Sequence, residues 1–91
     1  MTTCTAEIVN PLGLHARAAA RFVHMAAGFS SRVRVSRGSR VVDGKSIMGL
    51  LLLAAAQGST VSISTDGADE QAAADALCAL IARGFEEASC V

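Results

Sequence analysis

Two kinds of apolar periodicity alternate along this chain, and their order constrains its fold more than any other feature. Alternation at every second position is typical of half-buried strands and covers three segments: residues 2–9, 31–37 and 60–65. A turn at Gly38-Ser39 leads from the second of these segments into a further strand at residues 40–42. Helical spacing of apolar residues covers three more segments: residues 16–27, 47–55 and 69–87. The predicted order is therefore β-α-β-β-α-β-α.

The single apolar face of each predicted strand decides how the elements are layered. Such strands are typical of an antiparallel sheet that is covered on one side only. We therefore expect an α+β fold: a two-layer open-faced β-sandwich with three helices on one face of a four-stranded antiparallel sheet. The 91 residues suffice for one core, so we expect a single domain over residues 1–91. Three Phe and no Trp or Tyr leave Ala, Val, Leu and Ile to build that core.

The segment Asn10-Pro11-Leu12-Gly13-Leu14-His15-Ala16-Arg17 places a histidine and an arginine on a Gly/Pro turn at the predicted start of a helix. A helix start presents unpaired backbone N–H groups and the positive end of the dipole, so it suits a phosphate. The same dipole disfavours a protonated imidazole and keeps His15 a neutral nucleophile at neutral pH. We predict that His15 carries a phosphoryl group and that Arg17 supports its charge. The plainer alternative is that His15 is a surface residue or a helix cap.

The second histidine has a different setting. His24 lies in the middle of the predicted helix, beside Phe22 and Val23, with no turn or helix end next to it. We therefore predict a helix-surface or rim position for His24, without a direct role in the chemistry.

Several classes of function are disfavoured by the composition. A formal net charge of zero and few aromatic residues argue against nucleic-acid binding. The apolar run at residues 47–56 is far shorter than the roughly 20 residues that cross a bilayer. The first residues do not have the pattern of a signal peptide. We expect a cytoplasmic chain with no metal, no cofactor and no membrane contact.

The three cysteines, Cys4, Cys78 and Cys90, are an odd number without a paired spacing such as CxxC. Neither histidine lies near a cysteine in the sequence. This pattern argues against a zinc site and against a disulfide. We therefore expect reduced thiols, as is usual inside cells.

The segment Gly44-Lys45-Ser46 invites comparison with a phosphate-binding P-loop, but the spacing fails. A P-loop has four residues between its first glycine and its Gly-Lys-Ser. That first position is Ser39 in this chain, and Gly38 is one residue too far away. Ser46 is instead predicted to be the N-cap of the short helix, with its hydroxyl accepting a backbone N–H.

The short helix is apolar nearly all round, whereas a helix packed on a sheet buries only one stripe. If Leu50, Leu53 and Ala54 face the core, three residues stay at least partly exposed: Ile47, Met48 and Leu51. We predict that these three form a docking patch for partner proteins, with Arg17 and Arg21 as a cationic rim. The alternative is that the whole helix is deeply buried.

Two motifs and their spacing resemble HPr, the histidine-containing phosphocarrier family of the bacterial phosphoenolpyruvate:sugar phosphotransferase system. They are Gly13-Leu14-His15-Ala16-Arg17 and Gly44-Lys45-Ser46-Ile47-Met48-Gly49-Leu50, and the resemblance covers essentially the whole chain. It implies that His15 takes a phosphoryl group on Nδ1 from phospho-enzyme I and passes it to a IIA component, with Arg17 as the supporting cation. The chain is then a phosphoryl carrier and not a stand-alone enzyme.

The resemblance also bears on regulation. In many members of the family the serine that matches Ser46 is phosphorylated by an HPr kinase/phosphorylase. A phosphate there would add a charge of roughly −2 beside the docking patch and repel partners. The chain departs from the family at Ala18, because members of the family usually have proline directly after the His-Ala-Arg run. Alanine restores a backbone N–H in the first turn, so we expect a less rigid site with unchanged chemistry.

Other functions of the same fold stay open. One is a regulatory binding module that acts through phospho-Ser46 without relaying phosphate, although His15 and Arg17 would then have no purpose. Another is a carrier for a nitrogen-related branch of the phosphotransferase system rather than for sugar uptake. A small-molecule or metal-binding sandwich is disfavoured because Cys, His and carboxylate ligands are not clustered. We expect a monomer.

Overall fold

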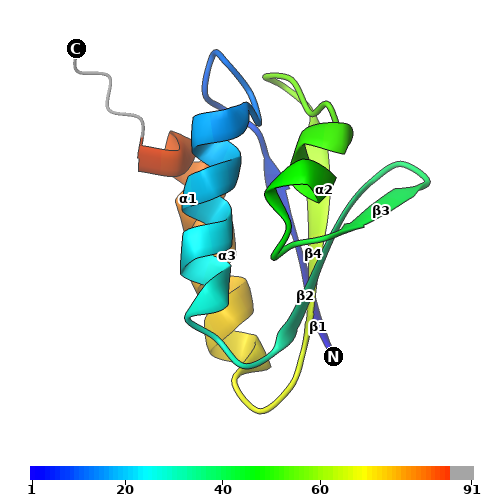
Figure 1. Cartoon of the computed structure of the whole chain (residues 1–91), viewed down its shortest axis with the longest axis vertical. Helices are drawn as coiled ribbons and strands as arrows, with labels where there is room; N and C mark the ends of the chain where they lie inside the picture. Colours follow the sequence, from blue (N-terminus) through cyan, green and yellow to red (C-terminus); the bar gives the residue numbers. More distant parts are fainter. Residues whose placement is uncertain (87–91) are drawn as a thin grey trace.

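The structure is a computed structural model that describes residues 1–86, and the elements follow the predicted order (Figure 1). A single 3-10 turn, η1, is added after the last helix of the described part. The elements are β1 (Thr2–Glu7), α1 (Ala16–Ala27), β2 (Arg32–Arg37), β3 (Arg40–Asp43), α2 (Ile47–Leu52), β4 (Thr60–Asp66), α3 (Glu70–Ala82) and η1 (Gly84–Glu86).

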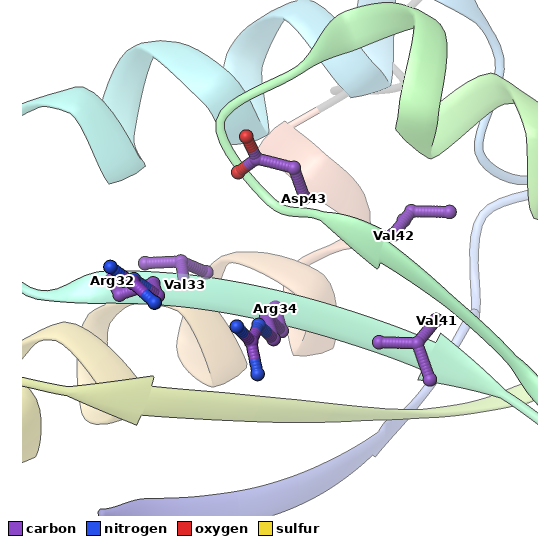
Figure 2. A pocket seen from close by; sticks show the side chains of 6 residues that line it. All are labelled: Arg32, Val33, Arg34, Val41, Val42 and Asp43. Carbon is purple, nitrogen blue, oxygen red and sulfur yellow. The ribbon is translucent and has the colours of Figure 1, made fainter.

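The four strands form one antiparallel sheet in the order β1-β4-β2-β3. In β4, Val61 and Ile63 are buried and the residue between them is only half-buried. On the edge strand β3, Val42 is half-buried and Val41 is 61% exposed, and Figure 2 shows their side chains on opposite sides of the strand. Helices α1 and α3 run along the apolar side of the sheet (Figure 1). The predicted open-faced sandwich of antiparallel strands is confirmed.

Helix α1 covers the sheet through a stripe of small and aromatic side chains. Its buried residues are Ala18, Ala19, Phe22 and Ala26. Apolar residues recur at helical spacing through Ala27, which predicts that Ala27 belongs to the buried stripe, but Ala27 is exposed and the prediction is wrong. One residue is about 100° of rotation around a helix, which carries Ala27 away from the stripe that Ala26 occupies.

Two helices end earlier than the periodicity predicts. Helix α2 ends at Leu52 rather than at residue 55, because Ala54 adopts a left-handed backbone with φ of 51°. The same turn leaves Ala54 exposed, so its predicted place in the core is wrong. Helix α3 ends at Ala82, and in η1 Phe85 has φ of 59° and still fills the core. Glu87, the predicted end of this helix, lies outside the described residues.

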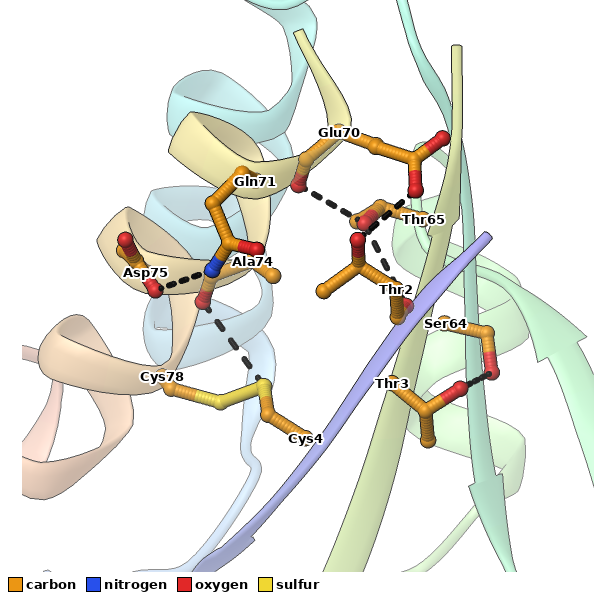
Figure 3. The surroundings of a disulfide bond; sticks show 10 residues. All are labelled: Thr2, Thr3, Cys4, Ser64, Thr65, Glu70, Gln71, Ala74, Asp75 and Cys78. Carbon is orange, nitrogen blue, oxygen red and sulfur yellow. Dashed lines mark hydrogen bonds between the residues drawn. A yellow bond between two sulfur atoms is a disulfide. The ribbon is translucent and has the colours of Figure 1, made fainter.

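A disulfide joins Cys4 in β1 to Cys78 in α3, with an S–S distance of 2.01 Å (Figure 3). The expectation of reduced thiols without a disulfide is therefore wrong for this pair. The two cysteines are 74 residues apart in the sequence and meet because α3 packs against β1. Cys90 lies outside the described residues. The bond fastens an edge strand of the sheet to the helix that covers it.

Two carboxylates at the start of α3 attach this helix to other segments: Asp69 to the loop before β2, and Glu70 to β1. Asp69 accepts hydrogen bonds from the Ser31 hydroxyl and from the backbone N–H groups of Ser30 and Ser31, the latter two at 2.9 Å. These bonds, the hydroxyl's first, lower the pKa of Asp69 to about 2. Glu70 accepts from the Thr2 hydroxyl at 2.7 Å (Figure 3), and this bond is the largest cause that lowers the pKa of Glu70 to about 2. Both carboxylates therefore favour the folded chain when ionised.

Candidate functional site

The chain reaches His15 from β1 through a tight turn that is held from two sides. Asn10 is buried, and its Nδ2 donates to the Gly13 carbonyl at 2.7 Å while the Gly13 N–H donates to the Asn10 carbonyl at 3.1 Å. Gly13 has φ of 66°, and a Cβ atom there would lie 2.6 Å from the Ala55 carbonyl oxygen. Only glycine fits this position, so the turn packs directly against the segment that follows α2.

His15 is the N-cap residue of α1, at the helix boundary where the sequence places it. Its backbone is extended, with φ of −88° and ψ of −178°, and its Nδ1 accepts a hydrogen bond from the Arg17 N–H at 3.3 Å. An acceptor nitrogen needs a lone pair, so the neutral ring in this arrangement carries its proton on Nε2. The side chain is half-buried. His15 is therefore a helix cap whose nucleophilic nitrogen faces the N–H groups of the first turn.

The first turn of α1 is electrically suited to an anion. It contains no acidic residue, and Arg17 is exposed at its second position. The unpaired N–H groups and the positive end of the helix dipole act in the same direction as the Arg17 cation. A negative charge on Nδ1 of His15 would thus meet favourable partners.

Ala18, which replaces the usual proline, is fully buried in the core and belongs to the regular helix. The Ala19 N–H donates to the His15 carbonyl at 2.8 Å, which is the first hydrogen bond of an α-helical ladder. The helix therefore starts at the expected residue without a proline in its first turn.

A cavity of about 620 Å³ lies along α1, and it is lined by Arg17, Ala20, Arg21, His24, Met25, Leu80 and Glu86. His24 is exposed, as predicted for a surface or rim residue. Arg21 is also exposed, but its Nη1 donates to the Phe85 carbonyl at 3.1 Å and to the Glu86 carbonyl at 2.8 Å. The structure thus brings Arg17 and Arg21 together on one helix face and gives Arg21 the further task of holding η1.

Ser46 is the N-cap of α2, and the prediction of this cap is confirmed. Its Oγ accepts a hydrogen bond from the Gly49 N–H at 3.0 Å. The preceding Gly44 is buried against β2, where a Cβ atom would lie 2.5 Å from Cγ1 of Val33. Lys45 is half-buried and donates through Nζ to the Phe29 carbonyl at 2.8 Å. The Gly-Lys-Ser segment therefore fixes the start of α2 against β2 and the residues after α1, and it is not part of a P-loop.

The outer side of α2 is apolar and accessible. Leu50 and Leu53 are buried, as predicted, while Ile47 is 40% and Met48 is 69% exposed. Leu51 is only half-buried. The alternative of a deeply buried helix is therefore wrong.

One member of this surface was missed from the sequence. Leu52 is 61% exposed and lies four residues after Met48, so helical spacing places it on the same side as Met48. It closes the helix just before the left-handed turn at Ala54, so its side chain has no further turn of helix beside it. With Leu52 included, the accessible apolar surface of α2, which is the predicted docking patch, consists of Ile47, Met48, Leu51 and Leu52.

A second cavity, of about 360 Å³, lies where β3 separates from β2 (Figure 2). It is lined by Arg32, Val33, Arg34, Val41, Val42 and Asp43. None of the predicted site residues takes part in it, and its lining mixes both signs of charge with valines.

Metal sites and membrane-spanning helices each have recognisable requirements. Among residues 1–86, no cluster of three or more His, Cys, Asp or Glu side chains could hold a metal ion. None of the helices in this part of the chain has the length and apolar character needed to span a bilayer.

Comparison with known proteins identifies the family. Residues 2–83 match the profile of the family described as "PTS HPr component phosphorylation site". The chain belongs to the HPr family. The phosphocarrier protein HPr of Cupriavidus necator is 59% identical over 80 residues, which are 88% of this chain and 90% of that protein. A crystal structure of HPr from Thermoanaerobacter tengcongensis superposes with a TM-score of 0.92 at 45% identity, covering 97% of this chain and 99% of that one.

This HPr-family chain is thus a phosphocarrier protein of the phosphotransferase system. The family also includes carriers with another name: the phosphocarrier protein NPr of Shewanella violacea is 40% identical over 82 residues, with 90% of each chain covered. The resemblance inferred from the two motifs is confirmed, and so is the four-stranded HPr-like architecture.

Proposed function

We propose that His15 accepts a phosphoryl group from phospho-enzyme I on Nδ1 and passes it to a IIA component. In the first step the Nδ1–P bond forms while the bond between phosphorus and enzyme I breaks. In the second step the Nδ1–P bond breaks as the IIA acceptor bonds to phosphorus. The observation that carries this proposal is the hydrogen bond from the Arg17 N–H to Nδ1 of His15, because it presents the Nδ1 lone pair at a helix start.

Arg17 is proposed to stabilise the phosphorylated state. A phosphoryl group brings close to two negative charges to Nδ1, where the N–H groups of the first turn and the helix dipole already favour an anion. The exposed Arg17 side chain adds a mobile guanidinium that can follow the group as it arrives and leaves. The ring proton stays on Nε2 throughout, so no separate general base is needed.

Both partners are proposed to use the docking patch on α2. Its Ile47 and Met48 are substantially exposed, and α2 packs against α1, which carries His15 at its start. Exposed apolar side chains, methionine above all, suit a surface that accepts several partners in turn. Arg17 and Arg21 provide cationic contacts at the rim. Because the surface is shared, enzyme I and the IIA component bind one at a time. The proposed carrier is a monomer in the cytoplasm and is not itself a stand-alone enzyme.

Ser46 is proposed as the site of regulatory phosphorylation by an HPr kinase/phosphorylase. The hydroxyl caps α2 directly before Ile47 and Met48 of the docking patch. A phosphate on Ser46 would be tolerated by the helix start but would place its charge beside an apolar interface. Partner binding would weaken, while the fold would remain.

The branch of the phosphotransferase system is a separate matter. Sugar uptake is the first candidate, because the 59% identical relative carries the name HPr. A nitrogen-related branch is the second, since an NPr also matches along most of the chain. Rates of phosphoryl transfer to purified IIA components of the two branches distinguish them.

Labelling decides whether His15 is the carrier residue. The chain is incubated with enzyme I and labelled phosphoenolpyruvate, and the product is tested for the acid lability and alkali stability of a phosphohistidine. We expect one labelled site in the wild type and none in His15→Ala. His24→Ala is the matched control and should be labelled normally. Label that survives in His15→Ala, or its absence from the wild type, would refute the carrier proposal. Binding to a partner only after Ser46 is phosphorylated, without any label on His15, would favour the regulatory binding module.

A further inference from the structure

The turn before His15 packs against the segment that follows α2, at Ala55. The Leu14 N–H donates to the Ala55 carbonyl at 2.9 Å, which links the residue before His15 to this segment. The Cβ position of Gly13 would lie 2.6 Å from the same carbonyl oxygen. A displacement of Ala55 would therefore be transmitted to His15 through one hydrogen bond and one close backbone contact.

Helix α2 by itself cannot fix the position of the Ala55 segment. It has six residues, and helices this short are not stable in isolation. The carbonyls of Leu50 and Leu51 accept the N–H groups of Leu53 and Ala54, but among the described residues no backbone N–H reaches the carbonyls of Leu52 and Leu53. The last turn also contains no basic residue. The chain then turns through Ala54, whose left-handed φ of 51° is unfavourable for alanine.

Two arginines from the β2–β3 hairpin supply what α2 lacks. Arg37 donates through Nη1 to the Leu53 carbonyl at 3.0 Å, and Arg40 donates through Nη1 to the Leu52 carbonyl at 2.6 Å. Cations are favourable at the negative end of a helix, and each guanidinium also satisfies an orphan carbonyl. The two arginines lie at the ends of β2 and β3 and are paired directly across the hairpin.

We propose that Arg37 and Arg40 are positioning residues for His15. They clamp the end of α2, so that the Ala55 carbonyl stays where it supports Leu14 and the turn before His15. The inference rests on the proposed function, because it assigns the pair a role in phosphoryl transfer as well as in folding. Neither arginine touches the imidazole or the phosphoryl group.

The chain offers a close control on β2 itself. Arg32 and Arg34 are exposed arginines of the same strand and have no hydrogen bond or ion pair from their guanidinium groups among the described residues. The double variant Arg32→Ala/Arg34→Ala removes the same two charges as Arg37→Ala/Arg40→Ala. Any difference between the two variants therefore comes from the clamp and not from net charge.

Hydrogen exchange tests the positioning directly. In Arg37→Ala/Arg40→Ala, we expect the Leu14 amide to exchange about tenfold faster, with the amides of β4 nearly unchanged. The His15 ring resonances should shift in the same variant. Arg32→Ala/Arg34→Ala should leave both readouts at wild-type values, and Arg37→Lys/Arg40→Lys should restore protection in part. A merely structural role would accelerate exchange in β4 and at Leu14 alike.

Kinetics test the consequence. With enzyme I and phosphoenolpyruvate, kcat for phosphorylation of Arg37→Ala/Arg40→Ala should fall about tenfold, because a small misplacement of the nucleophile is costly. The control variant should keep the wild-type kcat. Unchanged Leu14 exchange, or an unchanged kcat in a labelled protein, would overturn the inference. If the wild type accepts no label, the proposed function fails, and the exchange and ring-shift data alone decide whether the arginines position His15.

Discussion

The two ends of the helical layer are held by different kinds of interaction. Helix α3 has 13 residues and is cross-linked to β1 through Cys4–Cys78. Its ionised Asp69 and Glu70 attach it to the loop before β2 and to β1. Helix α2 has six residues, exposes most of its outer side, and depends on a serine cap and on hydrogen bonds from distant arginines. The α3 side therefore carries the stability, whereas the α2 side carries the exposed surface and the His15 turn. Functional surfaces are commonly drawn from the less stable parts of a fold.

The strongest test of this contrast removes the cross-link. In Cys4→Ser/Cys78→Ser, the free energy of unfolding should fall by about 4 kcal/mol, because the disulfide closes a long loop of the unfolded chain. Denaturation in urea measures the change, and phosphorylation of His15 should persist at temperatures where the variant stays folded. Cys90→Ser leaves the pair intact and should behave as the wild type. Equal stability of the paired-serine variant and the wild type would place the main support of the fold elsewhere.

A substitution on the outer side of α2 should have the opposite effect: it should weaken partner binding and leave the stability nearly unchanged. Met48→Asp should weaken binding to enzyme I at least tenfold, about 1.4 kcal/mol, because it puts a charge into the docking patch. The free energy of unfolding should change by less than about 0.5 kcal/mol, since Met48 is 69% exposed. Titration calorimetry and a thermal melt measure the two effects. Val41→Asp, at an exposed apolar residue of β3, is the control and should bind normally. A large loss of stability in Met48→Asp would show that this residue belongs to the core.

Acid should lower the stability of the fold by protonating the two carboxylates at the start of α3. The pKa values of Asp69 and Glu70 are lowered to about 2 in the folded chain, below their ordinary values of 3.8 and 4.5. Their contribution to stability is complete above the ordinary values and is lost as the pH falls toward 2. The melting temperature should therefore decrease over this window. Asp69→Asn should flatten the decrease, whereas Asp75→Asn, an exposed change on the same helix, should leave it steep. Identical slopes for the two variants would contradict the role of Asp69.

The smallest effect should be a gain on the α2 side. Ala54→Gly should raise the free energy of unfolding by about 0.5–1 kcal/mol, because glycine adopts the left-handed φ of 51° without strain. Ala54 is exposed, so no packing is lost. Ala72→Gly, at an exposed helical position of α3, should lose about as much as Ala54→Gly gains. Urea denaturation of both variants checks the signs, and a loss of stability in Ala54→Gly would contradict the assignment of strain.

The parts of the site that the sequence predicted are those that depend on neighbours along the chain. His15 and Ser46 were placed at helix starts because a turn precedes each and an apolar helix follows. Their caps involve partners two and three residues away, Arg17 and Gly49. The exposure of Met48 also followed from counting, since a helix on a sheet cannot bury every side.

Apart from the exposure of Leu52, most of the features that were missed involve residues far apart in the sequence. The Cys4–Cys78 disulfide spans 74 residues and has no spacing signature. The hydrogen bond from Arg37 to the Leu53 carbonyl depends on how the β2–β3 hairpin lies against α2. The early end of α2 follows from the left-handed Ala54, which has no intrinsic preference for that conformation, so tertiary packing imposed it against the local pattern. Helix α3 instead ends before Gly84, whose left-handed φ of 68° is a local stop signal that the apolar periodicity did not include.

The sequence by itself determined the order of the elements, the layer they form, the two helix caps and the family, because periodicity, capping and spaced motifs are local properties of the chain. Only the tertiary structure decided how the site is supported. It placed the Ala55 carbonyl under the turn before His15, brought Arg37 and Arg40 to the end of α2, and joined β1 to α3. Those contacts exist because packing brings distant segments together, and no local pattern of residues encodes which distant groups will meet.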